Sequence, residues 1–139
     1  MQFCGAERLG HGVRIVDDIT GPAGEEQLGR LAAYVRDRRI PLELCPTSNV
    51  QADTVATFAD HPVVRFLRAG VPVTINTDDI TVSDISLSEE WLSCIDVLGL
   101  TLPELWACNL HALRVAFVDE PTRARLLAEF PATEPLTAE

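Results

Sequence analysis

The run of residues 71–76, Val-Pro-Val-Thr-Ile-Asn, restricts the possible folds of this chain more than any other segment. It is nearly all apolar or β-branched, which is the pattern of a strand that is buried on both faces. Strands of this kind belong to parallel sheets with helices on both sides. The run therefore predicts an α/β fold rather than an all-helical or antiparallel one.

The rest of the chain fits the same alternation of strands and helices. Residues 6–10 and 40–45 are predicted as two further short strands. We expect a helix over 22–39, a polar loop over 46–60, and a short helix that Asp60 caps and Gly70 ends. Strand–helix alternation implies a parallel sheet with right-handed crossovers. Three strands cannot close a barrel, so they should leave an open edge and an apolar strand flank that needs a partner.

After Asp79 the chain is predicted to become helical as far as Phe130. Two capping boxes, Ser86-x-x-Glu89 and Thr101-x-x-Glu104, each precede an apolar pattern of helical period. Pro121 is expected to begin a last helix.

Polar residues follow the predicted strands. Asp78 and Asp79 come directly after the buried strand, and His11 follows the first strand. Two carboxylates beside apolar surface require a cation, a proton or hydrogen-bond donors, which points to a metal or a basic ligand. On the pair alone, a simple turn cap is the other interpretation. The segment Cys45–Asn49 also stays open between a hydroxyl that supports the site and a tight turn.

Three motifs in this order resemble the adenosine deaminases of the metal-dependent aminohydrolase group. They are Glu-Arg-Leu-Gly-His-Gly at 7–12, Glu-Leu-Cys-Pro-Thr-Ser-Asn at 43–49 and Asn-Thr-Asp-Asp at 76–79. The resemblance covers nearly all of residues 3–130, and it is to the C-terminal part of that family only. It implies the last three βα units of a (β/α)₈ TIM-type barrel, incomplete, with C-terminal helices. Residues 1–130 would form this part of the barrel, and 131–139 a disordered tail.

The resemblance also assigns roles to three residues. It implies that Asp78 is a zinc ligand, that Asp79 accepts a hydrogen bond from the purine, and that His11 is the catalytic histidine beside the attacking water. The reaction implied is the zinc-dependent hydrolysis of adenosine or 2′-deoxyadenosine to inosine and ammonia. A zinc ion makes water a nucleophile at neutral pH, which is the chemistry such a reaction needs.

Two motifs of that family do not occur in this sequence: the His-x-His pair and the His-Ala-Gly-Glu segment that supply the other zinc ligands and the general acid. Catalytic zinc usually takes three or more protein ligands. We therefore expect weak zinc binding and no activity from this chain alone. The alternatives are an adenine or modified-nucleoside deaminase of the same family, or a non-catalytic truncated protein that binds a partner or oligomerises through its strand edges.

The remaining features limit partners and location. The formal net charge of −10 argues against binding nucleic acid or anionic membranes. The four cysteines include no C-x-x-C pair and are predicted to be buried, reduced thiols, as in a cytoplasmic protein. His61 is expected to be an exposed residue at a helix start, and His111 a structural residue of a helix.

Overall fold

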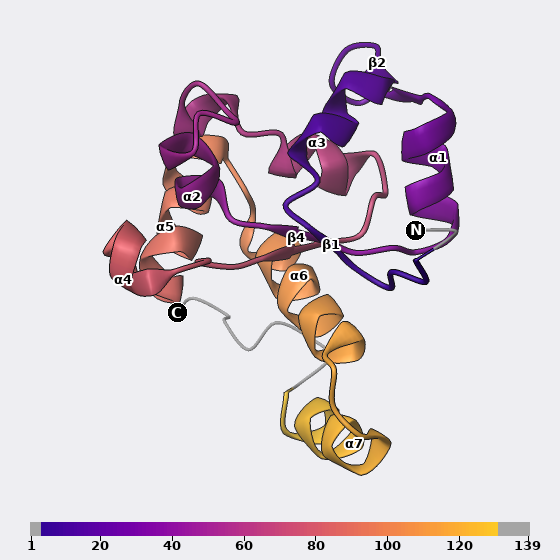
Figure 1. The fold of residues 1–139 in the computed structure, drawn as a ribbon, viewed down its shortest axis with the longest axis vertical. Helices are drawn as coiled ribbons and strands as arrows, with labels where there is room; N and C mark the ends of the chain where they lie inside the picture. The colour runs from indigo at the N-terminus through magenta and orange to yellow at the C-terminus, as the bar shows by residue number, and fades with distance from the viewer. Residues whose placement is uncertain (1–3, 131–139) are drawn as a thin grey trace.

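The computed structural model describes residues 4–130, and its centre is a parallel sheet of three strands in the order β1–β4–β5 (Figure 1). Leu42 of β4 pairs with Leu9 of β1 on one side and with Val73 of β5 on the other. The strands are β1 (Leu9–Gly10), β4 (Leu42–Leu44) and β5 (Val73–Ile75). The three predicted strands are confirmed, although each is shorter than expected. The predicted tail, 131–139, lies outside the described residues.

The connection from β1 to β4 differs from the prediction. Helix α1 spans Arg30–Asp37 instead of 22–39, and a small antiparallel sheet of β2 (Ile19–Thr20) and β3 (Gln27–Leu28) comes before it. Asp18 explains where the helix begins, because its Oδ2 accepts hydrogen bonds of 2.8 Å from the backbone N–H groups of Leu31 and Ala32. The predicted helix therefore began too early, because Gln27 and Leu28 form strand β3 instead of its first turns.

The segment after β4 is also more regular than predicted. Helix α2 (Pro46–Gln51) occupies the start of the expected loop, with Pro46 in its first turn. Helix α3 (Val63–Arg68) has Pro62, not Asp60, as its N-cap. The Asp60 carboxylate instead accepts a hydrogen bond from the Thr57 hydroxyl. A 3₁₀ helix, η2 (Phe58–Asp60), lies between α2 and α3, and another, η1 (Val13–Asp18), lies earlier, between β1 and β2.

Within residues 4–130, four helices follow β5; the three longer ones were predicted, and the short α4 was not predicted as a separate helix. Both capping boxes are present at the starts of α5 and α6. Helix α6 packs against β5, and α7 extends from its end away from the sheet (Figure 1). Trp106 of α6 stacks on Phe130 just beyond α7, with ring centroids 4.2 Å apart. The helices are α4 (Ile80–Ser83), α5 (Leu87–Leu98), α6 (Leu102–Val115) and α7 (Glu120–Glu129).

The hydrophobic core lies between the sheet and the helices that cover it. The side chains of β4 and β5 contribute to it from the centre, and Val35 of α1 and Phe66 of α3 are fully buried beside them. All three residues of β5 are buried, as the sequence pattern predicted. Within residues 4–130, no helix combines the length and the apolar character that a membrane crossing requires.

Candidate active site

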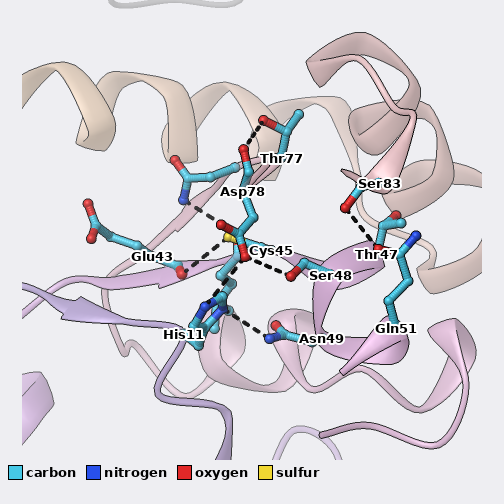
Figure 2. A network of polar contacts seen from close by, with 12 residues as sticks. His11, Glu43, Cys45, Thr47, Ser48, Asn49, Gln51, Thr77, Asp78 and Ser83 are labelled. Carbon is cyan, nitrogen blue, oxygen red and sulfur yellow. Dashed lines mark hydrogen bonds and ion pairs between the residues drawn. The ribbon is translucent and has the colours of Figure 1, made fainter. Parts of the chain in front are cut away.

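Three potential ligand side chains meet where the parallel strands end. His11 follows β1, Cys45 follows β4, and Asp78 lies just beyond β5. One donor atom from each lies within 4.8 Å of the other two, and His11 Nε2 is 3.7 Å from Asp78 Oδ2 (Figure 2). The carboxyl ends of neighbouring parallel strands lie at one edge of a sheet, so residues far apart in the sequence are brought together there. The polar residues that follow the predicted strands therefore lie together on one side of the sheet.

The backbone is unusual at two of these three positions. His11 and Asp78 have φ angles of +57° and +64°, in the left-handed region. Conformations of this kind are less stable by about 1–3 kcal/mol for residues other than glycine, and they occur preferentially at functional sites. They mark the points where the chain turns sharply out of β1 and β5. Figure 2 shows the two side chains directed toward each other across this edge.

Helix α2 supplies the polar support of the site. The Ser48 hydroxyl donates a 2.7 Å hydrogen bond to Asp78 Oδ2, and the Asn49 Nδ2 is 3.0 Å from His11 Nδ1 (Figure 2). Of the two interpretations left open for Cys45–Asn49, the supporting hydroxyl is the one that the structure contains. The sequence did not predict that this segment is a helix.

A buried glutamate holds α2 in place. Glu90 of α5 has no solvent exposure, and its two carboxylate oxygens accept hydrogen bonds from the Thr47 backbone N–H (2.8 Å) and the Thr47 hydroxyl (2.5 Å). These two bonds satisfy polar groups at the start of α2 that have no partner within the helix. Nothing in the neighbouring sequence distinguishes Glu90 from an exposed glutamate in the first turn of a helix.

The prediction that His61 is exposed is wrong. Its side chain is buried, at 4% exposure, and its Nε2 is 3.1 Å from Asn49 Oδ1. A chain of contacts therefore runs from His61 through Asn49 to His11. Burial lowers the pKa of His61 to about 4. The apolar residues Pro62–Val64 directly after His61 were the available signal for its burial.

The free energy of unfolding should therefore decrease as the pH is lowered, because His61 takes up a proton more easily in the unfolded chain. The unfolded chain takes up this proton near pH 6.5, whereas the folded chain does so only near pH 4. Stability is thus complete above pH 6.5 and declines by about 3 kcal/mol as the pH falls to 4. Urea denaturation across this range should show a steeper decline for the native chain than for His61→Gln, which does not titrate. Parallel curves for the two proteins would contradict the prediction.

The Cys45 thiol is buried beside the carboxylates. Burial first, and then the negative charges of Asp78, Glu90 and Glu43, raise the pKa of Cys45 to about 12. The sulfur is therefore protonated, and it donates a weak hydrogen bond to the Glu43 carbonyl oxygen at 3.7 Å. All four cysteines are free thiols, and Cys45, Cys94 and Cys108 are buried as predicted. The prediction is wrong for Cys4, which is exposed near the start of the chain.

Asp79 has a different environment from Asp78. Its Oδ1 accepts hydrogen bonds from the backbone N–H groups of Thr81 (2.9 Å) and Val82 (3.0 Å), so it caps α4. The turn-cap interpretation of the two aspartates therefore describes Asp79, whereas the Asp78 side chain faces His11 and Ser48. His111 lies in α6, outside this cluster, as predicted for a structural histidine.

The Asp78 carboxylate fits a zinc ion, because carboxylate oxygen is an ordinary zinc ligand, bound at about 2.0–2.2 Å. His11 Nε2 lies 3.7 Å from Asp78 Oδ2, beside the proposed ligand rather than as a second one. Asp78 Oδ2 is also accessible, because its side chain is 44% exposed. This edge of the sheet therefore offers a metal-binding carboxylate, Asp78, and an imidazole, His11, to the same small molecule.

Comparisons with known proteins agree on one family. The family model described as adenosine deaminase matches residues 1–132. An adenosine deaminase from Mycobacterium sp. (strain KMS) is 49% identical over 126 residues, which is 90% of this chain and 35% of that protein. The chain thus spans about a third of the length of the curated relatives it matches.

Solved structures give the same result for the fold. The crystal structure of an adenine deaminase from Arthrobacter aurescens superposes with a TM-score of 0.77 at 27% identity, covering 89% of this chain and 35% of that one. An amidohydrolase from Burkholderia ambifaria with bound zinc gives a TM-score of 0.71 at 28% identity, covering 89% of this chain and 32% of that one.

Proposed function

We propose that this chain, which belongs to the adenosine deaminase family, carries one part of the active site of a zinc-dependent adenosine deaminase. The observation that carries the proposal is the convergence of His11 and Asp78 at the ends of β1 and β5. The reaction is the hydrolysis of the exocyclic amine of adenosine or 2′-deoxyadenosine, giving inosine and ammonia. The 49% identity to a curated adenosine deaminase supports this substrate class.

Each polar residue at the strand ends has a role in this proposal. Asp78 binds zinc through Oδ2, and Ser48 fixes the orientation of that carboxylate with its hydrogen bond. Zinc, when bound, supplies the positive charge that makes water nucleophilic at neutral pH. His11, with Nε2 3.7 Å from Asp78 Oδ2, would orient the attacking water beside the metal ligand. Asp79 accepts a hydrogen bond from the purine with the carboxylate oxygen that does not cap α4.

The remaining zinc ligands come from outside these 139 residues. The sequence contains three histidines. The His61 Nε2 contacts Asn49, and His111 lies on α6 away from the strand ends. Asp78 alone falls short of the three or more protein ligands of a catalytic zinc. We therefore propose that the chain is the C-terminal part of a (β/α)₈ barrel and is inactive alone.

A chimaeric protein tests this function. In it, this chain replaces the matching segment of the Mycobacterium relative. The chimaera should bind one zinc ion and convert adenosine to inosine, measured by the absorbance change of the purine, whereas the 139-residue chain should show no turnover. Turnover of adenosine by the 139-residue chain alone would contradict the proposal that its active site is incomplete. A folded, zinc-loaded chimaera that deaminates adenine or a modified nucleoside but not adenosine would move the proposal to the alternative substrate.

Cys45 provides the control for the ligand assignment. It belongs to the same cluster of donor atoms, yet its thiol is buried and donates a hydrogen bond to the Glu43 carbonyl oxygen. Cys45→Ser should leave zinc affinity unchanged in the chimaera, measured by isothermal titration calorimetry. A large loss of affinity would make the sulfur a ligand and replace the proposed set.

The open sheet edges fit the same proposal. Within residues 4–130, β1 and β5 each pair with β4 on one side only. The other strands of a barrel would cover these edges. In the chain alone, pairing between copies is the alternative, and light scattering coupled to gel filtration distinguishes a monomer from an assembly.

A further inference from the structure

We infer that His61 and Asn49 are positioning residues that fix both the ring orientation and the tautomer of His11, with Nδ1 unprotonated and the proton on Nε2. The inference deepens the proposed function, because it specifies which nitrogen of the proposed catalytic histidine carries the proton toward Asp78. It rests on the line of contacts from His61 through Asn49 to His11.

Asn49 connects the two histidines and is 2% exposed. Its Oδ1 is 3.1 Å from His61 Nε2, and its Nδ2 is 3.0 Å from His11 Nδ1. An amide oxygen only accepts hydrogen bonds, and an amide nitrogen only donates them. His61 Nε2 must therefore carry a hydrogen, and His11 Nδ1 must offer a lone pair. A neutral imidazole with one acceptor nitrogen has its proton on the other, which is Nε2 in His11.

The opposite orientation of the amide group fails at His61. If the Asn49 amide were turned over, its nitrogen would donate to His61 Nε2, and His61 would need its proton on Nδ1. That nitrogen, however, accepts a hydrogen bond from the Val63 backbone N–H at 3.3 Å. Two N–H groups cannot share one hydrogen-bond axis. The backbone of α3 thus determines the tautomer of His61, His61 determines the orientation of the Asn49 amide, and the amide determines the tautomer of His11.

The surroundings keep this arrangement in place. The low pKa of about 4, caused by burial, keeps His61 neutral at physiological pH, so its Nδ1 remains an acceptor for Val63. The Thr47–Glu90 hydrogen bonds hold the start of α2, the helix that carries Asn49. At the other end, His11 Nε2 faces Asp78 Oδ2 at 3.7 Å. The protonated nitrogen of His11, Nε2, is therefore directed toward Asp78.

Tautomers are read directly by long-range ¹H–¹⁵N correlation spectra of the 139-residue chain labelled with ¹⁵N-histidine. At neutral pH, His11 and His61 should both show an unprotonated Nδ1 and a protonated Nε2. In Asn49→Asp, residue 49 can only accept hydrogen bonds, so the His11 signals should shift to those of a protonated Nδ1. His61→Gln keeps a donor near the Nε2 position, and His11 should retain the native pattern.

The outcomes are decisive in both directions. If the neutral His11 ring of the native protein carries its proton on Nδ1, the inference is wrong, whatever the variants show. An unchanged His11 pattern in a folded Asn49→Asp protein also overturns it. If Asn49→Asp does not fold, His61→Gln is compared with His61→Leu instead. Only the leucine variant removes the hydrogen-bond donor to the Asn49 amide oxygen, so only that variant should alter the His11 signals. The spectra need neither zinc nor substrate, so an inactive chimaera would count against the proposed function and not against this inference.

Discussion

Replacing Asp78 with asparagine should lower the zinc affinity of the chimaera by more than about 100-fold and abolish adenosine turnover with it. Loss of an outer partner of a metal ligand lowers affinity by about 10–100-fold, and loss of a ligand itself should exceed that. Asparagine preserves the size of the side chain and tolerates the left-handed backbone at this position. The change therefore removes the negative charge with little effect on the fold. Zinc affinity is measured by calorimetry and turnover by absorbance.

Asp53 offers a matched control for Asp78. It is also an aspartate with a left-handed backbone, at φ +52°, and it is exposed. Asp53→Asn should therefore leave zinc binding and turnover at native levels. If Asp78→Asn kept one tightly bound zinc ion, the assignment of Asp78 as a ligand would be wrong, whatever happened to activity.

Replacing Glu90 with alanine should destabilise the fold by about 3–5 kcal/mol. Glu90 is fully buried, so the change leaves a cavity and removes both acceptors of Thr47. Unsatisfied buried donors cost about 1–3 kcal/mol, and a truncated core side chain about 2–5 kcal/mol. Urea denaturation measures the difference in the free energy of unfolding.

The neighbouring glutamate is the control for this change. Glu89 is exposed, and it takes part in the capping box at Ser86. Glu89→Ala should cost about 1 kcal/mol, as the loss of a helix cap does. Equal effects of the two alanine changes would show that Glu90 stabilises the chain only as part of its helix and does not anchor α2.

Local patterns predicted the parts of the fold that depend on local chemistry. The buried strand at 71–76 and both capping boxes were recognisable because their signals lie within a few residues of one another. The convergence of His11 and Asp78 was predictable because parallel strands end at one edge. The resemblance to a known family then added roles that no spacing could supply.

The rest depends on contacts between distant segments. His61 is buried because it reaches Asn49, twelve residues earlier, and Glu90 is buried because it reaches Thr47, forty-three residues earlier. Neither partner is apparent from the residues around each position. Likewise, the start of α1 depends on Asp18, whose carboxylate reaches Leu31 and Ala32 across the β2–β3 turn. The periodicity of apolar residues could not show this contact, so the predicted helix began too early.

The left-handed backbone at His11 and Asp78 limits how this protein can be engineered. Glycine adopts that conformation without steric strain, so a library screened for thermal stability alone should enrich glycine at both positions. Each such clone would be relieved of backbone strain and would lack a side chain of the site. Any programme to make the protein more robust should therefore hold positions 11 and 78 fixed and search for stabilising changes elsewhere.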